Sequence, residues 1–83
     1  MKVLYFAWVR QKVGKQAEEI DPPEDIRTVA DLVEWLKGRG EEYEYAFADA
    51  AAIKAAVDQS HQPFDAPIVG AKEIAFFPPV TGG

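Results

Sequence analysis

Two short apolar runs lie at opposite ends of the chain, and they constrain its fold more than any other feature. Residues 3–9 read Val-Leu-Tyr-Phe-Ala-Trp-Val, and residues 73–77 read Glu-Ile-Ala-Phe-Phe. The first run is apolar on both alternating faces, as in a strand covered on both sides, and the second is also typical of a buried strand. We expect both runs to be interior strands and neighbours in one sheet.

The segment after the first run predicts a turn and a short return strand. Residues 10–15 contain Gly14 and form the predicted turn. Residues 16–21 predict a weaker, more polar strand that pairs with the first run as a hairpin. Pro22 and Pro23 lack the N–H groups that a β-ladder requires, so the strand ends before them.

One amphipathic helix is predicted after Thr28. Thr28 and Asp31 form a capping box, with Asp in place of the usual Glu. Apolar residues follow at positions i, i+3, i+4 and i+7: Val29, Leu32, Val33 and Leu36. Gly38 and Gly40 predict a left-handed end to this helix.

The second half of the chain is harder to interpret locally. Residues 41–57 are rich in alanine, which favours helix, but residues 53–57 fit a short strand equally well. Pro63 and Pro67 predict a loop, and Gly70 marks another turn. Together the elements predict an α+β domain with a mixed sheet of four or five strands and the helix across one face.

Composition excludes several classes of function. A chain of 83 residues has room for one small domain. It contains no cysteine and only one histidine, His61, which excludes disulfides, thiolate zinc sites, cysteine nucleophiles and polyhistidine metal centres. The net charge of −5 argues against a nucleic-acid partner, because residues 16–83 hold all 14 acidic residues. No apolar stretch is long enough for a membrane span, and we expect a cytoplasmic protein.

The last six residues form a segment of a different kind. Residues 78–83 read Pro-Pro-Val-Thr-Gly-Gly, and we divide the chain into a domain at 1–77 and a tail at 78–83. The prolines prevent further pairing and favour an extended arm with a reach of about 20 Å. Glycines allow its terminal carboxylate to enter a narrow passage, so this carboxylate is the candidate functional group. The alternative is an ordinary frayed terminus.

Several segments resemble one known family. Residues 75–83, together with residues 3–7, 9–10, 13–14, 55–59 and 64–67, are similar to the small, sulfur-carrier subunits of molybdopterin synthase (MoaD type). The resemblance covers essentially the whole chain and is most specific in the tail. It implies a ubiquitin-like β-grasp fold, with a sheet of four or five strands on one main helix. It also favours a helix at about 42–49 and a strand at about 53–57.

The resemblance implies a sulfur relay at the terminal carboxylate. In that family an ATP-dependent enzyme adenylates the last glycine, which then receives sulfur and becomes a thiocarboxylate. Gly83 would bear the sulfur, while Gly82 and Thr81 would line the narrow approach. The reach and direction of the tail would be set by Pro78, Pro79 and Val80. No cofactor is expected on this chain, which would not be catalytic alone, and ATP would be used by the activating enzyme.

The family also implies a partner surface. The loaded tail would enter the large catalytic subunit, which builds the molybdopterin dithiolene from cyclic pyranopterin monophosphate, in a heterotetramer. Phe6 and Phe77 match aromatic docking positions of the family, with core packing as the alternative role. His61 falls in an expected loop, either as an ordinary exposed side chain or as an altered partner contact. Family members usually have Asn at the position of Asp58, and a different turn at residues 69–72.

Three other functions remain open. One is a sulfur carrier for thiazole synthesis or tRNA thiolation, although the Phe-Phe-Pro-Pro-Val spacer favours molybdopterin. Another is a ubiquitin-like modifier that forms an isopeptide bond with a lysine. The last is an interaction module with an inert tail. A sulfur carrier would form a thiocarboxylate, whereas a modifier would form protein conjugates that are lost when Gly83 is deleted. An interaction module with an inert tail would keep its binding and function after removal of Gly82 and Gly83.

Overall fold

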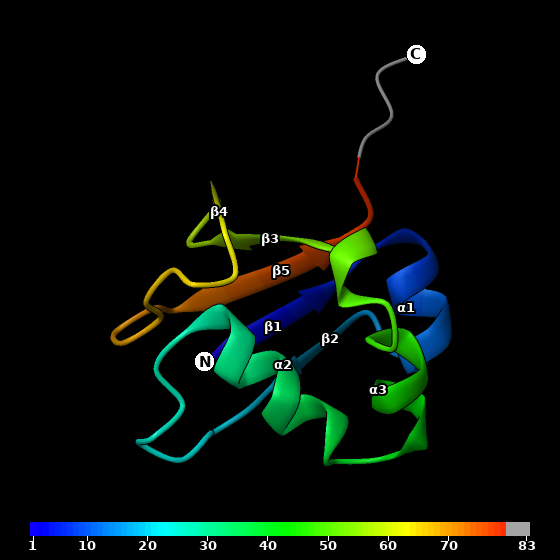
Figure 1. The fold of residues 1–83 in the computed structure, drawn as a ribbon, viewed down its shortest axis with the longest axis horizontal. Helices are drawn as coiled ribbons and strands as arrows, with labels where there is room; N and C mark the ends of the chain where they lie inside the picture. Colours follow the sequence, from blue (N-terminus) through cyan, green and yellow to red (C-terminus); the bar gives the residue numbers. More distant parts are fainter. Residues whose placement is uncertain (80–83) are drawn as a thin grey trace.

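The computed structural model describes residues 1–79 and shows one sheet with its helices (Figure 1). In chain order the elements are β1 (Lys2–Tyr5), α1 (Ala7–Val13), β2 (Ala17–Glu19), α2 (Val29–Lys37), α3 (Glu41–Ala46), the 3₁₀ turn η1 (Ala50–Ala52), β3 (Lys54–Val57), β4 (Ser60–Gln62) and β5 (Glu73–Phe77). The strands form a five-stranded sheet in the order β2-β1-β5-β3-β4. β1 and β5 are parallel, and the other pairs are antiparallel. The predicted mixed sheet is confirmed.

The two terminal apolar runs are neighbouring interior strands, as predicted. β1 pairs with β5 from Lys2 opposite Glu73 to Tyr5 opposite Phe76. β2 joins the free side of β1, in agreement with the predicted return strand. β5 lies between β1 and β3, so the strand that leads into the tail is the central one of the sheet.

The first strand is shorter than predicted, and the predicted turn at 10–15 is wrong. β1 ends at Tyr5, and residues 7–13 form α1. Val9 and Val13, four residues apart, are buried while Arg10 is exposed, which is the periodicity of a helix. Gly14 ends α1 with a φ of 87° and donates its N–H to the Arg10 carbonyl at 2.8 Å.

The predicted amphipathic helix is confirmed as α2, but its predicted end is wrong. Both hydrogen bonds of the Thr28–Asp31 capping box are present. The four apolar positions that define the helix are buried: Val29, Leu32, Val33 and Leu36. Gly38 has a φ of −76° and still donates to the Glu34 carbonyl, while Gly40 is extended with a φ of 167°. Neither glycine is left-handed, because the chain passes directly into α3.

The second half of the chain agrees with the predicted elements within a few residues. α3 covers most of the helix expected at about 42–49, η1 follows after that segment, and β3 is the strand expected at about 53–57. Gly70 lies in a turn with a φ of 81°. His61 is not in a loop, since it lies in the edge strand β4, where it pairs with Ala56. β4 is only three residues long and is followed by Pro63, which cannot donate to a ladder.

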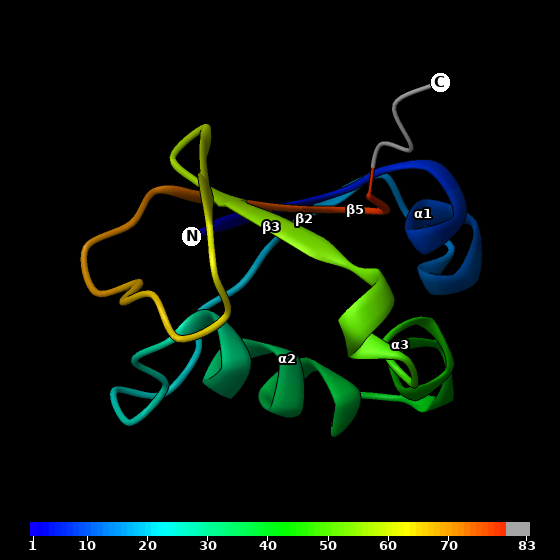
Figure 2. The same ribbon diagram turned by 45° about the horizontal axis from the view of Figure 1, so that its top comes forward.

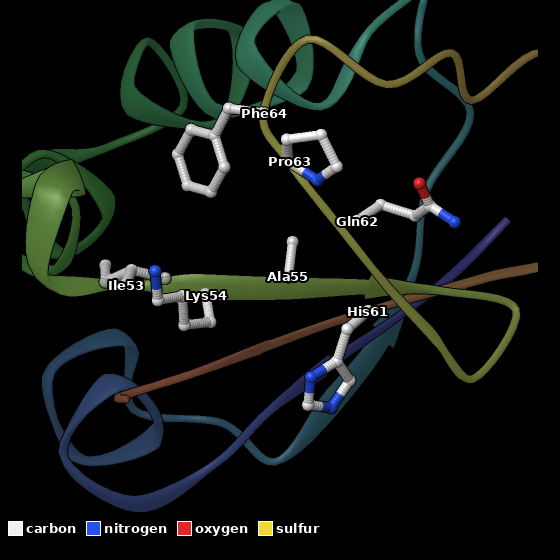
Figure 3. Close-up of a pocket in the computed structure, with 7 residues that line it drawn as sticks. All are labelled: Ile53, Lys54, Ala55, His61, Gln62, Pro63 and Phe64. Atoms are coloured by element: carbon white, nitrogen blue, oxygen red, sulfur yellow. The ribbon is translucent and has the colours of Figure 1, made fainter. Parts of the chain in front are cut away.

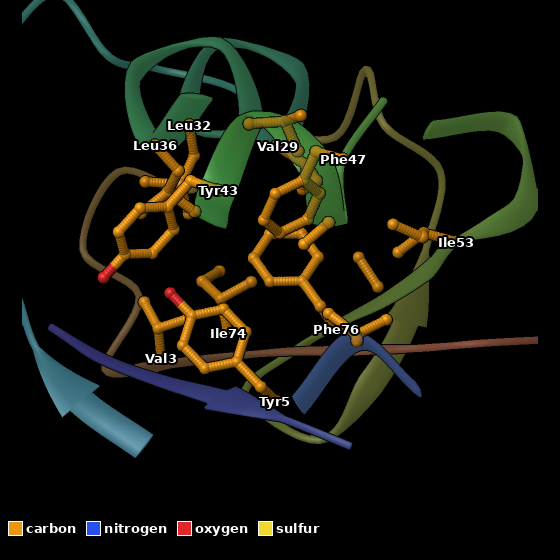
Figure 4. Packing of buried hydrophobic residues seen from close by; sticks show 14 of the residues in the cluster. Val3, Tyr5, Val29, Leu32, Leu36, Tyr43, Phe47, Ile53, Ile74 and Phe76 are labelled. Carbon is orange, nitrogen blue, oxygen red and sulfur yellow. The ribbon is translucent and has the colours of Figure 1, made fainter. Parts of the chain in front are cut away.

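The core lies on one side of the sheet. Figure 2 shows α2 and α3 beneath the sheet and α1 at its end, and no helix of residues 1–79 covers the opposite side. Figure 4 shows aromatic side chains from both layers in contact. Phe76 of β5 meets Phe47 edge-on at 5.0 Å between ring centroids and is stacked on Tyr5 at 6.4 Å. These contacts fix β5 at the centre of the domain.

Candidate functional site

The tail begins at the end of the central strand. β5 ends at Phe77, which lies opposite Lys54 of β3, and Pro78 and Pro79 follow it. Pro78 is half-buried and Pro79 is exposed. The remaining predicted tail residues lie outside the described residues: Val80, Thr81, Gly82 and Gly83. The structure therefore places the root of the tail on a rigid strand that is paired on both sides.

The side of the sheet without helices forms an open face. Because side chains alternate along a strand, the residues next to the buried Tyr5 and Phe76 point to this side. We name this whole side of the sheet the open face. Its apolar centre comes from β1, β3 and β5 and consists of Leu4, Ala56, Ala75 and Phe77. Leu4 is only half-buried, so the prediction that the first strand is covered on both sides is wrong.

Phe6 and Phe77, the predicted docking residues, both lie outside the core. The N–H of Phe6 bonds to the Phe76 carbonyl at 3.0 Å, which places Phe6 beside the end of β5. The side chain of Phe6 is 47% exposed, because Phe6 precedes α1 and its backbone leaves the sheet there. Phe77 is half-buried on the open face. The alternative of core packing is thus excluded for Phe6, and the docking role of both residues remains a prediction.

His61 packs against Phe77, a contact that the sequence did not predict. Their ring centroids are 5.1 Å apart with an angle of 45° between the rings. Figure 3 shows His61 on the side of β3 opposite Phe64. A pocket of about 560 Å³ lies between β3 and the chain after β4. Its lining consists of Ile53, Lys54, Ala55, His61, Gln62, Pro63 and Phe64.

A hydrogen-bonded cluster on the core side joins both layers of the domain. The Glu18 carboxylate accepts bonds from the hydroxyls of Tyr5 (2.8 Å) and Tyr43 (2.6 Å) and from Arg39 (2.9 Å). Burial disfavours the charged carboxylate, but these three donors outweigh it and lower the pKa of Glu18. Burial and the bond to Glu18 raise the pKa of Tyr5 and of Tyr43. The cluster is structural and lies away from the open face.

Neither a cluster of metal-ligating side chains nor a membrane-spanning helix occurs within residues 1–79. Within residues 1–79, no group of three or more His, Cys, Asp or Glu side chains could hold a metal ion. None of the helices in that range combines the length and hydrophobicity needed to cross a bilayer. What the described residues present is an apolar face beside the root of the tail.

Curated relatives match the chain over its whole length. A molybdopterin synthase sulfur carrier subunit of Escherichia coli (strain K12) is 41% identical over 83 residues, which is 100% of this chain and 99% of the relative. A protein of the same name from Haemophilus influenzae is 32% identical over the same coverage.

Solved structures match the fold. A putative molybdopterin converting factor, subunit 1, from Pyrococcus furiosus is 33% identical with a TM-score of 0.71, over 95% of each chain. The small archaeal modifier protein 1 of Haloferax volcanii is 25% identical with a TM-score of 0.73, over 96% of this chain and 97% of that one. With these neighbours the expected ubiquitin-like β-grasp fold is confirmed. The model of the ThiS family matches residues 3–83, and the chain belongs to that family.

Proposed function

We propose that this chain is the sulfur-carrier subunit of a molybdopterin synthase, with the sulfur carried at Gly83. The observation that carries the proposal is the whole-length match to relatives of that name, 41% identical in the nearer of the two described above. The sequence of the tail supports it, because Gly82 and Gly83 have no side chains that would obstruct a narrow active site.

The proposed chemistry takes place at the terminal carboxylate. A carboxylate oxygen of Gly83 attacks the α-phosphate of ATP in an activating enzyme, and pyrophosphate leaves. A sulfur nucleophile at the oxidation level of hydrosulfide then attacks the acyl carbon, the bond to AMP breaks, and loss of the sulfur-bound proton leaves the thiocarboxylate. Activation is needed because an ionised carboxylate is a poor electrophile, whereas AMP is a good leaving group. The chain itself acts as the carrier, needs no cofactor of its own, and is not catalytic alone.

The loaded tail would then act in the large catalytic subunit. There the thiocarboxylate donates sulfur to cyclic pyranopterin monophosphate, and water supplies the oxygen that regenerates the carboxylate for another cycle. Pro78, Pro79 and Val80 would set the reach of the tail, and Thr81 and Gly82 would pass through the narrow approach. Phe6 and Phe77 would anchor the large subunit against the open face, in a heterotetramer of the kind that the family forms. Because the dithiolene contains two sulfurs, the complex must release and rebind its carrier.

Reconstituted synthesis tests this proposal. Deletion of Gly83, or one residue added after it, is expected to abolish molybdopterin formation with the large subunit, the activating enzyme, ATP and a sulfur source. Val69→Ser is the matched control, since Val69 is 78% exposed and precedes β5, at the opposite end of that strand from the tail. Normal synthesis by either tail variant would contradict the proposed mechanism.

A modifier function is the second candidate, because one structural neighbour is named a modifier protein. Adenylation would begin in the same way, but a lysine amine would then displace AMP and form an isopeptide bond. Protein conjugates that contain this chain and disappear when Gly83 is deleted would favour this candidate. A thiocarboxylate product with no conjugates favours the sulfur carrier.

A further inference from the structure

The tail-proximal end of the open face carries two basic side chains beside its apolar centre. Lys54 lies opposite Phe77 in the β3–β5 register, and His61 packs against the same ring. Both side chains are exposed and both line the pocket between β3 and the chain after β4. We name this pair, Lys54 and His61, the basic pair.

The pocket lined by the basic pair includes no acidic residue, in a chain with 14 acidic residues and a net charge of −5. Lys54 forms no ion pair with any of residues 1–79. On the adjoining strands, Glu73 lies at the far end of β5, and Asp58 bonds to the N–H groups of Lys72 and Glu73.

From this arrangement we propose that the basic pair binds a carboxylate side chain of the protein that docks on the open face. The proposal rests on the proposed function, in which that protein is the large synthase subunit. A carboxylate at the open-face edge of the pocket would meet Lys54 and His61, while the apolar surface of the partner covers Phe77. When docking removes Lys54 and the carboxylate from water, their attraction becomes stronger. A partner without the carboxylate would leave Lys54 buried and unpaired, so the basic pair favours partners that carry the acid.

Isothermal titration calorimetry of the purified large subunit with variants of the whole chain tests this inference. Lys54→Gln is expected to raise the dissociation constant about tenfold, and Lys54→Glu to raise it further through like-charge repulsion. The losses are expected to shrink at high salt, because screening weakens charge pairs at the edge of an interface. Lys2→Gln is the matched control, because Lys2 is also an exposed lysine on the outward side of β1, at the other end of the sheet.

His61 is tested separately by substitution. His61→Gln is expected to weaken binding of the large subunit, and the double variant Lys54→Gln/His61→Gln is expected to bind more weakly than either single variant, because both side chains line the same pocket. Circular dichroism should show native folding in all variants, because both side chains are exposed.

The outcomes separate this inference from the docking proposal. Wild-type affinity of Lys54→Glu, together with weak binding of Phe77→Asp, would overturn the carboxylate contact and leave docking on the open face intact. Wild-type affinity of both variants would overturn docking there as well. The inference would also be overturned if Lys54→Glu weakened binding to the activating enzyme but not to the large subunit, since the carboxylate would then belong to a different partner.

Discussion

At the scale of single residues, Glu18 makes the most consequential polar contacts of the core. Its side chain is 11% exposed and accepts hydrogen bonds from two tyrosine hydroxyls and one guanidinium. Figure 4 shows the hydroxyls of Tyr5 and Tyr43 on the same side of the core. Glu18 thus links β2 with β1, with α3 and with the turn between α2 and α3.

Glu18→Gln is expected to lower the free energy of unfolding by about 1–3 kcal/mol at pH 7, because the charge-assisted bonds weaken. The pKa of Glu18 is lower in the folded state than in the unfolded state. Its contribution is therefore fully present above the unfolded-state pKa and is lost as pH falls through the lower pKa of the folded state.

Urea unfolding between pH 7 and pH 3 measures this contribution. Wild-type stability should fall more steeply with acidification than that of Glu18→Gln. Glu19→Gln is the matched control, because Glu19 is the next residue but its side chain is 77% exposed. Equal slopes for wild type and Glu18→Gln would contradict the role given to the cluster.

Asp58 gives a second prediction at this scale. It has a φ of 47°, followed by Gln59 at 72°, the positive values that a two-residue hairpin turn of type I′ requires. Its Oδ1 also accepts bonds from the N–H groups of Lys72 and Glu73, both at 2.9 Å. Asp58→Ala is expected to cost about 1–2 kcal/mol in unfolding free energy, whereas Asp58→Asn keeps the acceptor and should remain near wild type. Equal losses for the two variants in urea unfolding would count against this explanation.

At the scale of elements, prediction from sequence succeeded where one pattern had one interpretation. β5 was predicted with its observed bounds, and α2 with its capping box, because no competing periodicity was present. Residues 3–9 are apolar throughout, so strand and helix patterns overlap there, and α1 was missed. The sequence signal for a helix is the i, i+4 spacing of Val9 and Val13 ahead of Gly14. In the structure both valines are buried and Gly14 is left-handed.

The capping box of α2 provides a prediction at the same scale. Thr28 accepts from the Asp31 N–H at 3.1 Å, and Asp31 accepts in return from the Thr28 N–H at 3.2 Å. Thr28→Ala is expected to reduce the unfolding free energy by about 1 kcal/mol, since one N–H at the start of the helix loses its acceptor. Thr28→Ser retains the hydroxyl and should recover most of the loss in thermal or urea unfolding. A Thr28→Ala variant as stable as wild type would show that the cap contributes little.

At the scale of the whole molecule, the proposed docking role depends on an arrangement that the sequence does not display. The order β1–β5–β3–β4 places Phe6 beside the end of β5 and packs His61 against Phe77, although these residues are far apart in sequence. The tail motif was visible without a structure, as was the resemblance that it carries. The grouping of Lys54 and His61 around Phe77 was not, because it depends on strand register, and short apolar segments do not specify register.

The sulfur-carrier function is tested directly by the intact mass of the chain after incubation with ATP, a sulfur donor and the activating enzyme. Fragmentation then assigns any change to a residue. We predict replacement of one oxygen by one sulfur at Gly83, and no such change in a variant without Gly83. An unchanged mass, with the same enzymes shown to be active on an established carrier protein, would contradict the sulfur-carrier function.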